Sequence, residues 1–393
     1  MKRFIIMLVL FTHVGMAQNY VHQVFVLNEG YFDYNLNQSV SPVTIGAYMP
    51  SNQNYMTLDT IYGARFASDL VIDGDYFYVA ADNMLYKYDI NSYNVLASQQ
   101  VDGIRNIAIW NDKVIVSRGD YDNTTFSPIF FDSYLQIFNN SDLSLFLEFD
   151  TIVGPKWATQ NLIVDGDSIY VAINNAYEWG NYKGLIGIVD MNSMSYVDEI
   201  DLGLDGVNPD NMFLNDNHIY TVNNKDWTGL SISKINLLNN SVYTTNIGQA
   251  PTGCGSSCIR SDKINYQISG DTLIYEWNTQ TAPSNGTSIG YTHNFYDLAY
   301  DNINSLLYGS MTDYSTYGTI NIYSQNNTLI SSFQVGISPG TIAFDMRSAT
   351  DIHEIDSDMQ DNDIPFDILG RVSDNNRIQF FISPDGKKTM KLK

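Results

Sequence analysis

Two segments of the chain, residues 70–79 (LVIDGDYFYV) and residues 162–171 (LIVDGDSIYV), match each other nearly position for position. In both, an apolar run is followed by an Asp-Gly turn signal and then by a run rich in Tyr and Val. Asp-Gly between two such runs is typical of a β-hairpin with a two-residue turn. The pair therefore predicts a repeated antiparallel hairpin.

The same hairpin recurs along the chain. Residues 107–116 (IAIWNDKVIV) and 212–221 (MFLNDNHIYT) carry Asn-Asp or Asp-Asn at the turn, and residues 259–268 and 298–308 are looser copies. The copies start 37 to 55 residues apart, and no stretch outside the N-terminus shows a sustained helical period. Periods of this length, each built of a few short strands, are typical of propeller blades.

The repeats add up to seven blades. Six complete blades fit between about residues 64 and 339. The remaining strands start at residues 23–30 (QVFVLNEG) near the N-terminus and lie at residues 341–345 near the C-terminus. We therefore predict an all-β, seven-bladed β-propeller whose last blade is closed by N- and C-terminal strands, with the C-terminal strand innermost. Such a closure removes the open sheet edge between the first and last blades.

Composition excludes several classes of protein. The chain has 393 residues, 20 Lys and Arg against 43 Asp and Glu, and a net charge of -23. That balance argues against binding to nucleic acid or to an anionic membrane surface. With 44% hydrophobic and 13% aromatic residues the chain is not a disordered one, and two Cys exclude a disulfide-stapled scaffold.

The N-terminus has the features of an export signal. Lys2 and Arg3 precede an apolar run from residue 4 to residue 11, and Gly15-Met16-Ala17 matches a small-x-small cleavage site. We expect residues 1–17 to be a signal peptide and the protein to be exported. No later segment approaches the length of a transmembrane helix.

The segments beyond the repeats give the expected domain organisation. Residues 18–347 form the propeller, residues 348–366 an acidic linker, and residues 367–393 a short C-terminal segment with a basic tail.

The blade geometry predicts where a binding site lies. In a four-stranded blade, the loop between strands two and three opens on the same face as the loop that joins one blade to the next. We call this the loop face, and function concentrates on such loops. Aromatic residues there offer rigid contact area, and the basic residues could meet a phosphate or a carboxylate, or could simply pair with a neighbouring Asp. The candidate ligand-binding residues are Tyr31, Arg65, Asp69, Arg105, Arg118, Trp157, Tyr177, Trp179, Trp227, Tyr296 and Tyr314.

Catalytic and metal-binding patterns are sparse. The His residues stand alone in their segments, so we expect no metal site, no cofactor and no assignable catalytic residue. Acids on the loop face, such as Asp69, Asp210 and Asp297, leave glycoside-type chemistry open, although nothing in the sequence singles them out. In an exported protein, Cys254 and Cys258 could form a small-loop disulfide.

Two motifs carry a resemblance to known families. The opening VFVLNEGYF (residues 24–32), together with the DGD hairpins, resembles the YncE-like seven-bladed propellers exported by Bacteroidetes, over roughly residues 20–346. Some members of that family capture cobalamin over an outer-membrane transporter. The C-terminal DILGR (residues 367–371), FFI (residues 380–382) and GKKTMKLK (residues 386–393) resemble a type IX secretion sorting signal. The resemblance implies passage across the outer membrane, followed by release or attachment to the cell surface.

Three functional hypotheses follow from the sequence. The first is an exported, non-catalytic protein that binds a small molecule or a protein through the loop face, with a cobalamin-like nutrient as the sharper version that the resemblance implies. The second is a propeller enzyme, a lyase or glycosidase, acting on an extracellular substrate. The third is a structural partner in an outer-membrane assembly.

Overall fold

The computed structural model describes residues 19–248, 257–280 and 287–348, together with three short strands nearer the C-terminus. The chain divides into a unit of residues Asn19–Arg347 and a second unit that contains the C-terminal strands. Among the described residues, no helix is long and apolar enough to cross a membrane.

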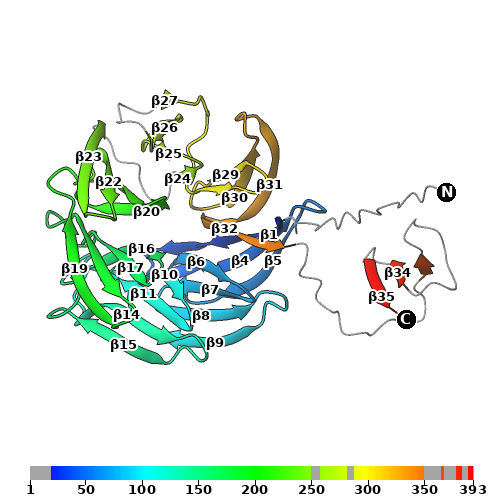
Figure 1. Ribbon diagram of the computed structural model, residues 1–393, viewed down its shortest axis with the longest axis horizontal. Coiled ribbons are helices and arrows are strands. Elements are labelled where there is room, and N and C mark those ends of the chain that lie inside the picture. Colours follow the sequence, from blue (N-terminus) through cyan, green and yellow to red (C-terminus); the bar gives the residue numbers. More distant parts are fainter. Residues whose placement is uncertain are drawn as a thin grey trace, which may run out of the picture. The chain divides into compact units, whose positions relative to one another are not determined.

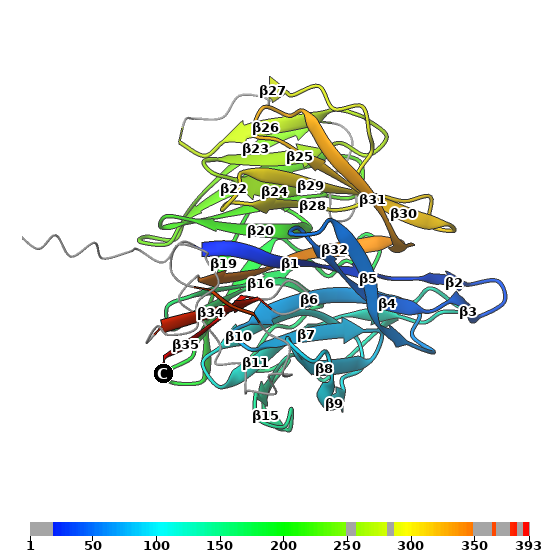
Figure 2. The same cartoon turned by 90° about the vertical axis from the view of Figure 1, so that its right-hand side faces the viewer.

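The first unit is a β-propeller. Its described residues form seven four-stranded antiparallel sheets, and Figures 1 and 2 show them arranged around a common centre. The predicted all-β, seven-bladed fold is therefore confirmed.

In six blades the four strands follow one another along the chain, from the innermost strand outward. Blade I consists of β6 (Ala67–Asp73), β7 (Tyr76–Ala81), β8 (Met84–Asp89) and β9 (Val95–Gln100). Blade II consists of β10 (Ile104–Trp110), β11 (Lys113–Arg118), β14 (Ser133–Asn139) and β15 (Leu145–Asp150). Blade III consists of β16 (Thr159–Asp165), β17 (Ser168–Ile173), β18 (Leu185–Asp190) and β19 (Ser195–Asp201).

The next three blades repeat this order. Blade IV consists of β20 (Pro209–Asn215), β21 (His218–Asn223), β22 (Leu230–Asn236) and β23 (Ser241–Gly248). Blade V consists of β24 (Ser257–Arg260), β25 (Lys263–Gln267), β26 (Ile274–Asn278) and β27 (Thr287–Ser288). Blade VI consists of β28 (Leu298–Asp301), β29 (Leu306–Met311), β30 (Tyr317–Tyr323) and β31 (Leu329–Ile337).

The hairpin turns explain why the repeated segments fold alike. β6 and β7 are joined by Gly74 and Asp75, and Gly74 has a φ of 56°. Gly166, at the same place between β16 and β17, has a φ of 58°. Two-residue hairpins need this left-handed conformation, which glycine adopts at the least cost. The Asp-Gly signal therefore corresponds to a real structural requirement.

Blade VII closes the ring with strands from both parts of the chain. Its order is β32 (Pro339–Ser348), β1 (Asn19–Asn28), β4 (Val43–Met49) and β5 (Asn54–Ile61), so the late strand β32 is innermost. Beyond the end of β1, the amide of Glu29 donates to the carbonyl of Ser338 at 2.8 Å, and the amide of Gly30 donates to that of Ile337 at 3.0 Å. The predicted closure is confirmed.

One buried side chain links the closing blade to blade I. Gln23 on β1 is fully buried, and its Nε2 donates to the Asp345 carboxylate on β32 at 3.0 Å. Its Oε1 accepts a hydrogen bond from the Tyr93 hydroxyl of blade I at 2.9 Å. The side-chain amide of Gln23 therefore connects β1 with two segments that are far from it in the sequence.

The core lies between neighbouring blades. Between blades VII and I, the Phe25 ring lies 4.7 Å from the Phe77 ring, and the Phe77 ring stacks on Tyr88 at 4.6 Å. All three residues are fully buried. Each aromatic side chain of this kind buries enough apolar surface to contribute several kcal/mol, and packing of this kind holds adjacent sheets face to face.

Two small hairpins and a C-terminal sheet add to the predicted strands. β2 (Tyr31–Asp33) pairs with β3 (Gln38–Ser41), and β12 (Asp120–Tyr121) pairs with β13 (Pro128–Ile129); both lie in loops between the second and third strands of their blades. In the second unit, β33 (Ile364–Phe366), β34 (Ile378–Ile382) and β35 (Lys388–Leu392) form a three-stranded sheet.

Several predicted segments are not covered by the structure. The expected signal peptide, residues 1–17, lies outside the described residues. The same holds for most of the expected linker at residues 348–366 and for the DILGR motif of the sorting-like segment.

We predict that Gln23→Leu destabilises the propeller, because it leaves the buried Asp345 carboxylate and the half-buried Tyr93 hydroxyl without the amide that joins them. The expected loss in the free energy of unfolding is about 1–3 kcal/mol, the usual range when buried polar partners are left unpaired. Urea unfolding would measure it. Gln100→Leu, at an exposed position on β9, should change stability by less than about 0.5 kcal/mol. Equal effects of the two substitutions would contradict the proposed role of Gln23.

Candidate functional site

A cavity of about 320 Å³ lies where the innermost strands of the blades begin. Its lining combines carboxyl, amide, hydroxyl and guanidinium groups with a few apolar side chains. The lining residues are Glu29, Phe66, Ala67, Ser68, Asp69, Arg105, Asn106, Gln160, Asn161, Asp210, Asn211, Tyr296, Asp297, Leu298, Gly340, Thr341 and Ile342. We call it the central cavity.

A recurring β-bulge supplies much of this lining. In blades I to IV, the register between the innermost strand and its neighbour shifts near the start of the innermost strand. In blade II, for example, Ile104 pairs with Arg118 and Ile107 with Val116, so Arg105 and Asn106 together oppose Ser117 alone. A bulge of this kind redirects a side chain that regular pleating would send to the other face. It brings two consecutive polar residues from one strand to the cavity.

Blade VI has the same arrangement just before β28. The amide of Tyr296 donates to the Ser310 carbonyl at 2.8 Å, and the amide of Ser310 donates to the Asp297 carbonyl at 3.0 Å. Two residues therefore again oppose one. Tyr296 and Asp297 line the cavity as the polar pairs of the other blades do.

Two carboxyl groups of the cavity are hydrogen-bonded to neighbouring strands. Asp69 Oδ2 accepts a hydrogen bond from the Ile107 amide at 2.8 Å, and Asp297 Oδ2 accepts one from the Ile342 amide at 3.0 Å. Each bond links one blade to the innermost strand of the next. The acids therefore tie the blades together and at the same time line the cavity.

Burial raises the pKa of these two carboxyl groups. The pKa of Asp69 rises to about 6, with the hydrogen bond from Ile107 as the main opposing effect. The pKa of Asp297 rises to about 7, also mainly through burial, and the negative charges of Asp69 and Glu29 raise it further.

Glu29 and Asp210 complete a set of four acids. Glu29 Oε1 accepts a hydrogen bond from the Tyr296 hydroxyl at 2.7 Å, and Asp210 Oδ2 accepts one from Asn224 Nδ2 at 3.1 Å. Burial raises the pKa of Glu29 to about 7 and that of Asp210 to about 6, although the positive charge of Arg105 partly offsets both increases. Near neutral pH the cavity therefore holds carboxyl groups in both protonation states.

Arg105 brings a positive charge among these acids. Its guanidinium carbon lies 5.2 Å from the centre of the Phe66 ring and 5.4 Å from that of Tyr177. Aromatic rings at these distances attract a cation and limit its motion. Tyr177 in turn packs against Gly119, where an added Cβ would meet the Tyr177 ring at 2.6 Å. The blade III loop is thereby held close to Arg105.

The cavity also contains an acceptor that has no partner in the described part of the chain. Besides the four carboxyl groups, Asn106 Oδ1 is a buried acceptor with no hydrogen-bond partner among the described residues. Such an atom needs a donor from water or from a ligand. Within the part of the chain that the structure describes, no three His, Cys, Asp or Glu side chains are grouped to hold a metal ion. An N–H or O–H donor of a ligand or water would satisfy the Asn106 oxygen.

Of the residues predicted from the sequence, three line the central cavity: Asp69, Arg105 and Tyr296. Tyr177 does not line the cavity, but its ring contacts the guanidinium of Arg105, which does. Tyr314, with 57% of its surface exposed, makes an edge contact with the Tyr296 ring at 5.2 Å between centres. The structure thus brings these five predicted residues to one region.

Two of the predicted basic residues serve the fold instead. Arg118 is buried, and it donates to the carbonyls of Asp102 and Ser133 at 2.8 and 2.7 Å. Arg65 forms ion pairs with Asp82 and Asp120 at 2.5 and 2.8 Å. Pairing with a neighbouring Asp, the alternative interpretation for these positions, describes Arg65, whereas Arg118 is held by backbone carbonyls.

The remaining predicted residues lie outside the central cavity. Tyr31 is half-buried on β2, and Trp157 packs in the core between blades II and III with Lys183 Nζ 4.8 Å from its ring centre. Trp179 is 75% exposed, and Trp227 has a φ of 66° in the loop before β22.

Only one of the two cysteines can be placed. Cys258 is a buried thiol at the start of blade V, and burial raises its pKa to about 12. Cys254, its predicted disulfide partner, lies outside the described residues.

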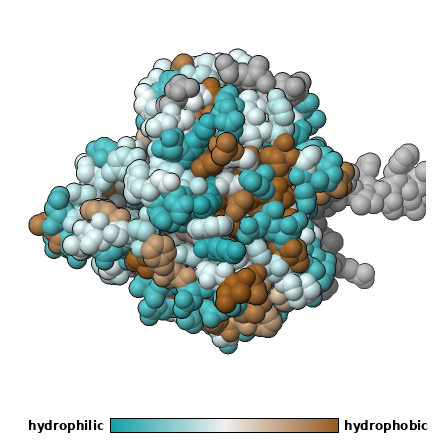
Figure 3. All heavy atoms as spheres, turned by 90° about the vertical axis from the view of Figure 1, so that its left-hand side faces the viewer, coloured by the Kyte–Doolittle hydropathy of each residue, from teal (hydrophilic) through white to brown (hydrophobic). Residues whose placement is uncertain are grey.

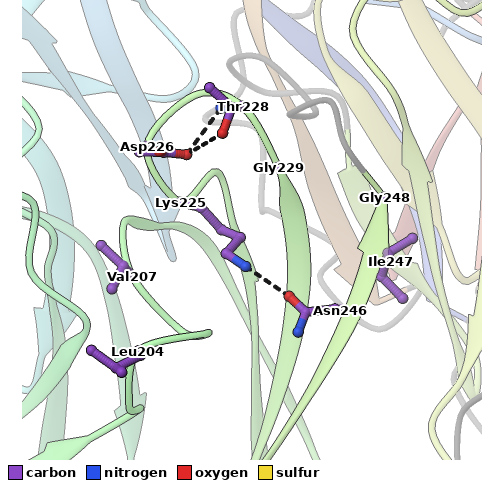
Figure 4. A pocket seen from close by; sticks show the side chains of 9 residues that line it. All are labelled: Leu204, Val207, Lys225, Asp226, Thr228, Gly229, Asn246, Ile247 and Gly248. Carbon is purple, nitrogen blue, oxygen red and sulfur yellow. Dashed lines mark hydrogen bonds between the residues drawn. The ribbon is translucent and has the colours of Figure 1, made fainter.

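A second cavity, of about 600 Å³, lies beside blade IV (Figure 4). Its charged groups are occupied within the protein, because Lys225 Nζ donates to Asp205 at 3.1 Å and to Asn246 at 2.8 Å. The Asp226 carboxylate accepts hydrogen bonds from Thr228, as Figure 4 shows. No carboxyl group with a raised pKa lines this cavity, so it lacks the features that distinguish the central one.

Sequence reasoning placed Asp210 and Asp297 on the loop face but did not select them. A signal was nevertheless present, because a polar pair directly precedes the apolar run of several innermost strands. Examples are Ser68-Asp69, Arg105-Asn106, Gln160-Asn161, Asp210-Asn211 and Tyr296-Asp297.

Comparison with solved structures supports the same architecture. A hypothetical selenium-binding protein from Sulfolobus tokodaii aligns with a TM-score of 0.59 and 9% identity, over 84% of this chain and 94% of that one. The dihydro-heme d1 dehydrogenase NirN, in complex with DHE, aligns with a TM-score of 0.52 and 14% identity, over 85% of this chain and 77% of that one. At these identities the likeness shows the propeller fold alone. No protein-family model matches the sequence, and no curated protein matches it.

We predict that Asp297→Asn changes how stability depends on pH. Between its unfolded pKa near 4 and its folded pKa of about 7, Asp297 holds a proton in the folded state that the unfolded chain has lost. Its contribution to stability is therefore fully present below about pH 4 and is lost as the pH rises through 7. The variant, measured against the wild type, should gain about 2–3 kcal/mol between pH 5 and pH 8 in chemical unfolding.

The matched control is Asp313→Asn. Asp313 is exposed, and hydrogen bonds from the Ser315 and Thr316 amides lower its pKa to about 2, so it stays ionised over this range. Its substitution should leave the pH profile between 5 and 8 unchanged. A constant difference between Asp297→Asn and wild type across that range would refute the assignment.

Proposed function

We propose that the protein is exported and binds a polar small molecule in the central cavity without converting it chemically. One observation carries the proposal: polar residues from several blades converge on a single cavity, among them Arg105, Gln160, Asp210 and Tyr296. A concave site with a few converging polar groups is the usual form of a ligand site. The export-type features of residues 1–17 support the location.

The balance of hydrogen-bonding groups suggests the kind of ligand. Glu29, Asp69, Asp210 and Asp297 accept hydrogen bonds when ionised, and Asn106 Oδ1 is an unsatisfied acceptor. A ligand rich in N–H donors matches such a lining. A cobalamin-like nutrient, which the resemblance to YncE-like propellers implies, carries peripheral amides that supply these donors.

Cavity size limits how such a ligand can bind. A volume of about 320 Å³ lies at the lower end of the range of roughly 300–1,000 Å³ for small-molecule pockets. Only one edge of a large ligand would enter. The rest would lie over the loop face, where Tyr177, Trp179 and Tyr314 offer aromatic surface.

An enzyme that uses the same acids is the second candidate. It is favoured by the pKa of about 7 for both Glu29 and Asp297, since a general acid or base works best when its pKa lies near the working pH. The contact between Glu29 and the Tyr296 hydroxyl places two groups able to exchange protons side by side.

We predict that calorimetric titration of the purified protein with cobalamin and with a precursor corrinoid gives submicromolar binding. Gln160→Ala and Asp210→Asn should each weaken it about tenfold or more, because each removes or neutralises a polar group of the cavity. Asp226→Asn, in the second cavity, should leave the affinity unchanged.

Two other results are informative. If a cooperatively folded sample binds neither corrinoid, the hypothesis that the ligand is cobalamin-like is wrong. Heat that continues after saturation, together with a new product in the mixture, would favour the enzyme over the binding protein.

A further inference from the structure

The two small hairpins form one raised surface on the loop face. The Tyr34 hydroxyl, near the tip of β2–β3, hydrogen-bonds the Tyr121 hydroxyl of β12–β13 at 2.8 Å. The Phe126 ring lies 6.1 Å from Tyr34 and 6.0 Å from Tyr121. Figure 2 shows the β2–β3 hairpin extending beyond β1 and β4. The hairpins therefore support each other.

The two hairpins and the residue that follows β13 expose large apolar side chains. The exposed fractions are 63% for Leu36, 54% for Val40, 55% for Phe126 and 71% for Phe130. We call these four residues the hairpin crest. Apolar residues gathered on a raised surface are typical of interaction sites, because their burial against a partner is favourable.

A groove of about 490 Å³ runs along the inner side of the hairpins. Its lining includes the apolar side chains of Phe32, Ile129 and Phe131. We call it the hairpin groove. It offers room for large side chains of a partner, while the hairpin crest offers a rim.

The hairpin groove is also acidic. Asp82, Asp102 and Asp120 line it, and Arg65 is the single basic residue among its lining residues. Arg65 is already paired with Asp82 and Asp120. The groove therefore keeps a net negative charge at neutral pH, and a complementary occupant would be basic.

Two of the most exposed apolar side chains in the described part of the chain lie outside this surface. Ile152 is 85% exposed and Leu204 is 94% exposed, but neither lines the hairpin groove. On the side of the propeller seen in Figure 3, apolar side chains form separate patches with hydrophilic ones between them. The hairpins stand out because an apolar crest and an acidic groove adjoin.

We propose that the hairpin crest and hairpin groove dock a protein partner through a segment in which large apolar side chains are flanked by Lys or Arg. The apolar side chains of that segment lie in the groove and against the crest, and its basic side chains meet Asp102 and the neighbouring acids. A second copy of this chain, with its net charge of -23, would bring like charge to the groove. An anionic membrane surface would be repelled for the same reason.

This interaction is separate from binding in the central cavity. The guanidinium carbon of Arg65, in the hairpin groove, lies 5.2 Å from the ring centre of Phe66, in the central cavity, so the two sites adjoin, but they share no lining residue. Failure of one proposal therefore leaves the other standing.

The test uses a fluorescently labelled short peptide in which Lys alternates with Phe and Leu, and it measures fluorescence anisotropy with the full protein at physiological salt. The expected result is saturable binding that Phe130→Ser and Asp102→Asn each weaken at least tenfold. Ile152→Ser and Asp226→Asn, matched substitutions elsewhere on the protein, should change the affinity less than twofold. Cooperative thermal unfolding of each variant would show that it is folded.

Two altered peptides separate specific docking from simple charge attraction. A peptide with Ser in place of Phe and Leu, and one with Glu in place of Lys, should each bind at least tenfold more weakly. Absence of saturable binding by the first peptide would overturn the proposal. So would equal binding of the Ser peptide, or an equal loss of affinity in Ile152→Ser and Phe130→Ser.

Discussion

The closure of the ring by β32 beside β1 is the constraint on which the rest of the structure depends. It joins strands from both ends of the propeller into one sheet, blade VII, and leaves no open edge in the ring. It also completes the central cavity, because Glu29 follows β1 while Gly340 lies on β32. The hydrogen bond from the Ile342 amide to Asp297 then joins the closing blade to blade VI. The strands that close the ring therefore also carry residues of the central cavity.

The central cavity concentrates groups that are costly to bury. Four carboxyl groups and one guanidinium line it, and desolvation raises the pKa of each carboxyl group. The fold retains them because two, Asp69 and Asp297, bind backbone amides of the next blade. Burial of the remaining carboxyl groups lowers the stability of the fold, and a ligand that donates hydrogen bonds to them would offset this cost. Functional sites commonly reduce stability in this way.

Local sequence signals predicted much of the fold. The Asp-Gly turns at Gly74 and Gly166 and the closing strand at residues 341–345 are local patterns, and the structure has them where the sequence indicated. The central cavity was harder to predict, because a β-bulge depends on pairing between strands and not on the composition of one strand. The structural role of Arg118 could not be predicted from the sequence either, because its hydrogen-bond partners are backbone carbonyls that folding brings near it.

The most direct test of the account is a pH titration of the side-chain carboxyl groups by carbon-13 NMR, assigned with Glu29→Gln, Asp69→Asn, Asp210→Asn and Asp297→Asn. We predict four carboxyl signals that titrate near pH 6 to 7, each lost in one variant. Titration of all four near the ordinary value of about 4 would contradict the description of the cavity as a desolvated cluster of acids.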